Sequence, residues 1–161
     1  MPTNILRDGA RPPGPGLQHT DPPTAETRHV LISAGTITIR AQLLATATAD
    51  RIWQALPIRS TAEIWGAEIH FETVVESGRE RGAKLVVTPG EIAFAPDRDV
   101  ISIAYGRTPT SRTGELRLWS PSNVWAKALD DVTALKAVRP GEKVEVVRLP
   151  GVASLPRSAV E

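Results

Sequence analysis

The sequence predicts a mostly-β protein that folds as a closed barrel of about eight strands with one or two short helices. Three observations support this class. Apolar and polar residues alternate in many short segments, turn signals recur at intervals of about 8–12 residues, and only one segment shows clear helical spacing. A chain of 161 residues fits a single domain, and closing a barrel removes the exposed strand edges that promote aggregation.

The predicted strands begin with residues 36–43, where Ile37, Ile39, Ala41 and Leu43 share one face. The remaining strands are predicted at 67–72, 84–88, 91–95, 100–105, 124–129 and 142–149. The Pro89-Gly90 turn predicts that 84–88 and 91–95 pair as a hairpin.

Helical spacing is clearest in residues 48–56. Ala49, Ile52, Trp53 and Leu56 follow the i, i+3, i+4, i+7 pattern of an amphipathic helix. Thr46 or Thr48 is expected to cap its first turn, and Pro57 to end it. A second, shorter helix is predicted at 130–138, before Pro140-Gly141.

The two ends of the chain are expected to lie outside the folded unit. Residues 1–28 are rich in Pro, Gly and charged side chains and are predicted to form a disordered tail, and 150–161 a smaller flexible tail. The domain is therefore expected to span 29–149. No apolar run approaches the ~20 residues of a membrane-spanning helix, and no signal peptide is recognisable. The expected location is cytoplasmic.

Composition excludes several classes of function. The chain has no cysteine, which rules out disulfides, thiolate nucleophiles and Cys-ligated metals. A net charge of +1, with basic and acidic residues interleaved, predicts no nucleic-acid or membrane partner. Neither a phosphate-binding glycine loop nor a nucleophile elbow is present. No cofactor, metal site or catalytic residue is therefore predicted.

Candidate binding residues come first from one strand. Glu68, His70 and Glu72 are two residues apart, so they share the face opposite Ile69 and Phe71. Two carboxylates beside an imidazole could bind a divalent metal or carry out acid–base chemistry, but alternating charges are also the commonest pattern on the solvated face of a strand.

Further candidates lie at strand ends. Trp65 and Tyr105 each precede a glycine, where aromatic residues either line a cleft or plug the barrel. Arg107 and Thr108 lie in the loop that follows Tyr105. Arg107, like Arg112, could hold a carboxylate ligand or be an ordinary solvated arginine.

Five segments, in order, resemble motifs of the cyclophilin-like proteins of bacteria and archaea. They are Ala41-Gln42-Leu43-Leu44 with Ile52-Trp53-Gln54-Ala55-Leu56-Pro57; Trp65-Gly66-Ala67-Glu68-Ile69-His70-Phe71; Gly90-Glu91-Ile92-Ala93-Phe94; Tyr105-Gly106-Arg107-Thr108-Pro109; and Ser120-Pro121-Ser122-Asn123-Val124. The resemblance implies a cyclophilin-type closed barrel with a helix plugging one end. In true cyclophilins the active cleft lies outside the barrel, where the Glu68 trio is also expected.

The resemblance does not imply prolyl isomerase activity. True cyclophilins carry a Phe-His-Arg segment and a Gln-Gly-Gly-Asp segment, and neither string occurs in this chain. Whether the protein is an enzyme is left open, and the expected function is binding of a small molecule or peptide segment in an outer cleft. The alternatives are an accessory subunit or scaffold for a hydrolase-type enzyme, or a divergent prolyl isomerase. Oligomeric state is not predicted.

Overall fold

The structure, a computed structural model, describes residues 28–150, so both predicted tails lie outside the described residues except for Arg28 and Pro150 at their borders. The described strands are β1 (His29–Ala34), β2 (Ile37–Leu43), β3 (Ile58–Thr61), β4 (Glu63–Ile64), β5 (Glu68–Glu72), β6 (Lys84–Val87), β7 (Glu91–Ala95), β8 (Val100–Ala104), β9 (Leu116–Ala128) and β10 (Lys143–Leu149). An α-helix, α1 (Ala47–Ala55), and a 3₁₀ helix, η4 (Val132–Ala137), complete the fold.

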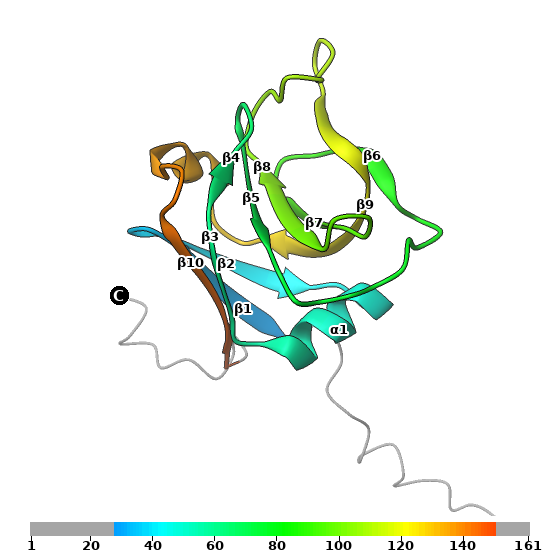
Figure 1. Cartoon of the computed structure of the whole chain (residues 1–161), viewed down its shortest axis with the longest axis vertical. Helices are drawn as coiled ribbons and strands as arrows, with labels where there is room; N and C mark the ends of the chain where they lie inside the picture. Colours follow the sequence, from blue (N-terminus) through cyan, green and yellow to red (C-terminus); the bar gives the residue numbers. More distant parts are fainter. Residues whose placement is uncertain (1–27, 151–161) are drawn as a thin grey trace, which may run out of the picture.

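The strands form one antiparallel sheet that curls into a nearly closed barrel (Figure 1). The order is β3-β10-β1-β2-β9-β7-β8-β5-β4, with β6 paired to β9 outside this path. The two ends of this order, β3 and β4, are separated in sequence by Ala62 alone, so the sheet closes on itself at one seam. The predicted mostly-β barrel with two short helices is confirmed.

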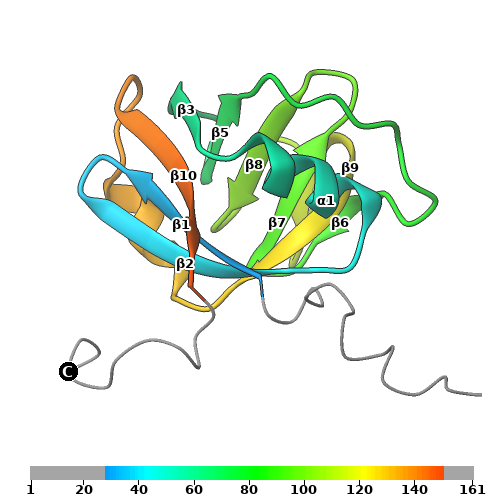
Figure 2. The ribbon, with the colours of Figure 1, turned by 90° about the horizontal axis from the view of Figure 1, so that it is seen from below.

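Helix α1 lies across one end of the barrel (Figure 2). The Thr46 side chain accepts a hydrogen bond from the Ala49 backbone N–H at 3.0 Å, which makes Thr46 the N-cap. Ala49 and Ile52 are buried in the core, and the helix ends before Pro57, as its missing N–H requires. The second predicted helix is present in a tighter form, as the 3₁₀ helix η4.

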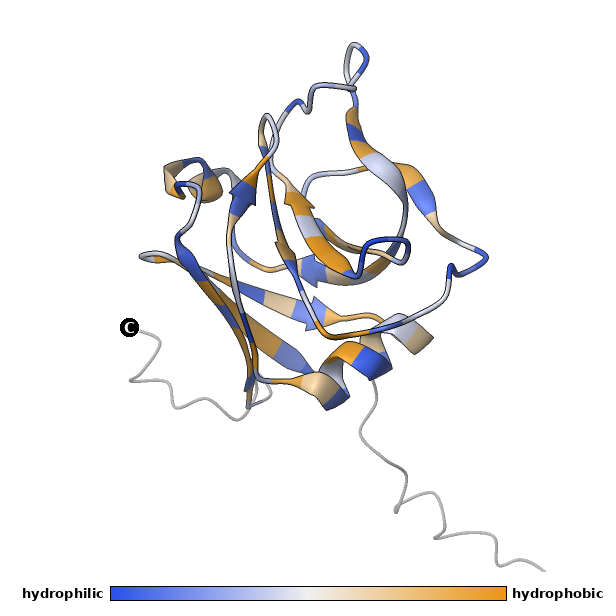
Figure 3. Cartoon of the chain, viewed as in Figure 1, coloured by the Kyte–Doolittle hydropathy of each residue, from blue (hydrophilic) through white to orange (hydrophobic). Residues whose placement is uncertain are grey.

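The core fills the barrel with bulky side chains, and Figure 3 shows the alternation of hydrophobic and hydrophilic residues along the strands that produces it. The largest fully buried side chains are Trp125, Phe71, Phe94, Ile32, Ile39, Leu43, Ile52, Ile69, Ile92, Ile101, Ile103 and Leu135. Among the described residues, no helix has the length and apolar character needed to cross a membrane.

Strands β7 and β8 are buried on both faces. Their inner positions are bulky, whereas their outer positions are mostly small, including Ala93, Ser102 and Ala104. A second, smaller apolar cluster forms on this outer side, where Ala93 and Ala104 meet Val87 and Leu118. Small outer residues therefore allow β6 and the first half of β9 to pack against the outside of the barrel.

Strand β9 changes partners along its length. Residues 116–122 pair with β6, and residues 123–127 pair with β7. The predicted hairpin between 84–88 and 91–95 is therefore wrong, because β6 pairs with β9, and β7 pairs with β8 and β9. A turn does form at Pro89-Gly90, with the Glu91 N–H donating to the Thr88 carbonyl at 3.1 Å. However, β6 and β7 both run antiparallel to the long β9, which is the partner of both strands. The predicted strand 124–129 covers only the second half of β9.

Candidate functional site

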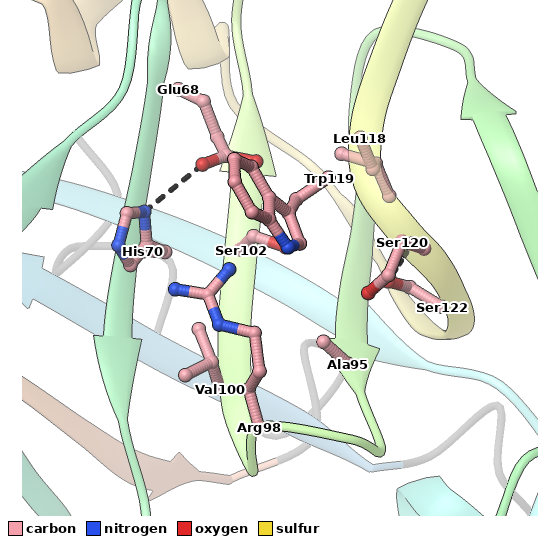
Figure 4. Close-up of a pocket in the computed structure, with 10 residues that line it drawn as sticks. All are labelled: Glu68, His70, Ala95, Arg98, Val100, Ser102, Leu118, Trp119, Ser120 and Ser122. Carbon is pink, nitrogen blue, oxygen red and sulfur yellow. Dashed lines mark hydrogen bonds and ion pairs between the residues drawn. The ribbon is translucent and has the colours of Figure 1, made fainter.

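The candidate site lies on the outer face of β5 and β8, beneath the first half of β9 (Figure 4). Alternation along β5 turns Ile69 and Phe71 into the core and leaves Glu68 and His70 on the outer face. A small cavity there is lined by Glu68, His70, Ala95, Arg98, Val100, Ser102, Leu118, Trp119, Ser120 and Ser122.

Glu68 and His70 form a directly bonded pair in this cavity. Glu68 Oε1 lies 3.0 Å from His70 Nδ1 (Figure 4). Glu68 is only 3% exposed, although it lies outside the barrel. The burial follows from β9, which crosses the outer face of the sheet. The predicted placement of both residues on one face, opposite the core, is what the structure shows, but Glu68 is not a solvated strand residue.

His70 lies between two carboxylates. Its Nε2 is 3.2 Å from Glu63 Oε1, on β4, so each ring nitrogen has an acidic partner. The hydrogen bond with Glu68 raises the pKa of His70 above its usual value, and the charges of Glu68 and Glu63 add to this effect. Burial and the positive charge of Arg98 act in the opposite direction. The net effect is a raised pKa, because the hydrogen bond with Glu68 outweighs burial.

The second carboxylate oxygen of Glu68 is the free polar group of the site. Within residues 28–150 no hydrogen bond engages Oε2, and Figure 4 shows it on the side of Trp119. The cavity is partly open to solvent, and the space inside it measures about 10 Å³, which is room for a single water molecule. A larger ligand must therefore extend beyond the cavity or displace part of its wall.

Trp119 and Arg98 form the part of the wall that faces solvent. Trp119 is 59% exposed, which is unusual for so large an apolar side chain. The guanidinium of Arg98 lies 5.6 Å from the centre of the Trp119 ring. Trp65 packs edge-on against Trp119, with ring centres 5.5 Å apart and an interplanar angle of 72°. Trp65 therefore borders the site through Trp119.

A tight turn holds Trp65 in this position. Gly66 adopts a φ of +62°, and a Cβ there would lie 2.7 Å from the Pro109 side chain. The Ala67 backbone N–H donates to the Arg107 carbonyl at 2.8 Å. The two motifs that contain Gly66 and Arg107, forty residues apart in the sequence, thus form one packed unit.

The remaining predicted site residues lie elsewhere. Glu72 is exposed at the other end of β5. Tyr105 is half-buried against the core, and burial raises the pKa of its hydroxyl. Thr108 is buried, and its hydroxyl donates to the Arg117 carbonyl. Arg107 is exposed and donates to the Ser111 carbonyl at 3.2 Å. These contacts hold the 105–117 loop together, and none of the four residues lines the cavity.

Sequence reasoning missed Glu63, Arg98, Ser102 and Trp119. Arg98 and Trp119 come from a turn and from a strand segment that showed no alternation, so no local pattern connects them to Glu68. Glu63 reaches His70 because β4 pairs with β5. Across the part of the chain that the structure describes, no group of three or more His, Asp or Glu residues is arranged to hold a metal ion.

Three comparisons with known proteins place this fold. The family model described as "Cyclophilin-like" matches residues 28–147. The solution structure of the hypothetical protein AF2241 from Archaeoglobus fulgidus is similar, with 33% sequence identity and a TM-score of 0.68 over 78% of this chain and 97% of that one. No curated protein sequence gives a match.

A more distant structural neighbour is McbB, solved in complex with tryptophan. It shares 15% identity and a TM-score of 0.56 over 73% of this chain, which spans 44% of the McbB chain, so this likeness concerns the fold alone. The family match covers most of the chain, and the first neighbour is aligned over nearly its whole length. The chain therefore belongs to the cyclophilin-like family.

Proposed function

We propose that the cavity around Glu68 is a binding site for a small molecule or a peptide segment. The observation that carries this proposal is Glu68 itself, a carboxylate that is 3% exposed and has one oxygen without a partner in residues 28–150. Oε2 is not among the fully buried side-chain atoms that lack a partner. It is therefore open to a ligand that donates a charge-assisted hydrogen bond to it.

The wall of the cavity supports the same proposal. An exposed tryptophan beside convergent polar groups is typical of a binding site. Ser102 adds a hydroxyl from β8, and Arg98 adds a positive charge. McbB, which resembles this chain over 44% of its length, has been solved in complex with tryptophan.

A ligand screen that follows tryptophan emission tests the proposal, because Trp119 lines the cavity and Trp65 packs against Trp119. We expect hits that shift the emission of the wild type, and loss of at least about tenfold in affinity in Glu68→Gln, the size expected for one charge-assisted hydrogen bond. Glu72→Gln is the matched control, since Glu72 lies on the same strand but outside the cavity. Hits that bind wild type and Glu68→Gln equally well would refute the site.

The two other functions remain weaker proposals. An accessory role beside a hydrolase-type enzyme would be supported by co-purification of such an enzyme. A divergent prolyl isomerase would need a donor for the prolyl amide, and Arg98 lies nearer to the cavity than Arg107 does. A coupled peptide assay that shows turnover lost in Arg98→Ala, but not in Arg107→Ala, would favour it.

A further inference from the structure

Arg98 occupies the candidate site in an unusual way. Arg98 is exposed, and among residues 28–150 its guanidinium makes no hydrogen bond or ion pair. It lies over the face of Trp119, 5.6 Å from the ring centre. Figure 4 shows the guanidinium between His70 and Trp119, directed toward the cavity.

The groups that Arg98 faces are suited to a cation. The π face of tryptophan attracts ammonium and guanidinium groups more strongly than any other aromatic ring does. Glu68 presents an unpaired oxygen to the same cavity, within a side chain that is more than nine-tenths buried. Glu63 adds a further negative charge across His70.

Charge balance points in the same direction. Glu63 and Glu68 contribute two negative charges, which the positive charge of Arg98 partly offsets. If Arg98 moves out to solvent, as an exposed arginine can do at little cost, the cluster loses one positive charge. An incoming cation would restore the balance and could also donate to Glu68 Oε2.

We infer that the cavity binds an organic cation, which is an amine or guanidinium group attached to a flat or apolar body. In the free protein the Arg98 guanidinium occupies the position of this cationic group. The inference rests on the proposed function and names its ligand class. The cationic group would replace Arg98 over Trp119 and pair with Glu68, while its body would lie against Trp119 and Trp65. The same chemistry is found in free amines and in the Lys or Arg side chain of a peptide.

Three probes of similar size and different charge test the ligand class: benzylamine, benzyl alcohol and benzoate. Binding is measured by calorimetry on the full chain. We expect wild type to bind benzylamine in preference to the other two. Arg98→Ala should bind benzylamine at least about threefold more tightly, because it removes the internal competitor for the Trp119 face.

Two further variants test the residues that receive the cation. Glu68→Gln should weaken benzylamine binding at least about tenfold, and Trp119→Ala should also weaken it. Trp119 is exposed, so its variant remains informative if Glu68→Gln folds poorly. Glu72→Gln should bind like wild type. A Gly-Arg-Gly peptide blocked at both ends separates the two sources, since tighter binding of the peptide than of benzylamine identifies a side chain as the ligand.

Other outcomes would overturn the inference. Equal or tighter binding of benzoate or benzyl alcohol would show that the site takes a different chemistry, while leaving the proposed binding function intact. Weaker benzylamine binding in Arg98→Ala would show that Arg98 contributes to ligand binding rather than competing with the ligand for the face of Trp119. No heat with any of the probes, in wild type or Arg98→Ala, would reject the cation as ligand, and the emission screen described above would decide separately whether the cavity binds anything.

Discussion

Replacing Asn123 with alanine should destabilise the domain more than any surface change. Asn123 lies on β9, is 1% exposed, and belongs to the Ser-Pro-x-Asn-Val motif. Its Nδ2 donates to Thr48 Oγ1 and to the Gly78 carbonyl, each at 2.9 Å, and its Oδ1 accepts from the Glu80 backbone N–H at 2.9 Å. One side chain therefore ties the 73–83 loop to the start of α1.

The expected loss follows from these three hydrogen bonds. Each contributes about 1 kcal/mol net, and a buried partner left unsatisfied costs about 1–3 kcal/mol. The Glu80 N–H and the Gly78 carbonyl both lose their partner, but the loop can relax toward solvent. We therefore expect Asn123→Ala to lower the free energy of unfolding by about 3 kcal/mol, a large share of the roughly 5–15 kcal/mol typical of a domain.

Urea denaturation measures the loss, and amide hydrogen exchange locates it. Exchange should accelerate in residues 76–80 and change little in β1 and β10, which lie elsewhere in the barrel. The control is Gln54→Ala, which removes an exposed amide on α1 and should change stability by less than about 0.5 kcal/mol. A loss below about 1 kcal/mol for Asn123→Ala, or unchanged exchange in the loop, would refute the assigned role.

Three further outcomes are expected. Because the pKa of His70 is raised, the stabilisation that protonated His70 provides is complete below about pH 6.5 and is lost as the pH rises through the folded-state pKa. The difference in unfolding free energy between wild type and His70→Gln should therefore shrink toward high pH. Urea denaturation from pH 5 to 9 measures this difference. Hydrogen bonding from Arg40 lowers the pKa of Asp130, so Asp130→Asn should cost about 1 kcal/mol at pH 7, after allowance for solvent screening. The cost should shrink as the pH falls through the lowered pKa of Asp130, and a cost that does not decrease in acid would contradict this. Limited proteolysis should leave a stable fragment that begins near residue 29, as the composition of the N-terminal segment predicts, and persistence of the intact chain would count against the predicted tail.

Local patterns were sufficient to predict most of the barrel. Alternation at Ile37–Leu43 and at Ile69 and Phe71 identified core-facing residues correctly, because a strand with one buried face has a period of two. The 48–56 helix was predicted to within one residue of α1 at each end, since Thr46 and Pro57 mark its boundaries. These features depend on residues that are neighbours in sequence.

Strand β1 (His29–Ala34) was not predicted, although Val30, Ile32 and Ala34 alternate as core-facing residues. The other features that were not predicted depend on long-range pairing. The two-residue strand β4 is too short to show any alternation, yet it brings Glu63 to His70. The burial of Glu68 and the position of Trp119 both follow from the path of β9 across the outside of β7 and β8. A turn signal such as Pro89-Gly90 predicts where a turn forms, but it does not specify which strands pair with each other.

The division of β9 into two halves has a consequence for how this protein can diversify. Residues 123–128 belong to the barrel wall, whereas residues 116–122 pair only with β6 and carry Trp119 over the cavity. Pro121, which has no N–H to donate, lies close to the point where β9 changes partners. Under the proposed function, substitutions at Arg98 and at exposed positions of residues 116–122, such as Trp119, would alter what the cavity accepts without disturbing the barrel. This separation would make these positions the place where related proteins acquire different ligands, and a practical place to engineer new ones.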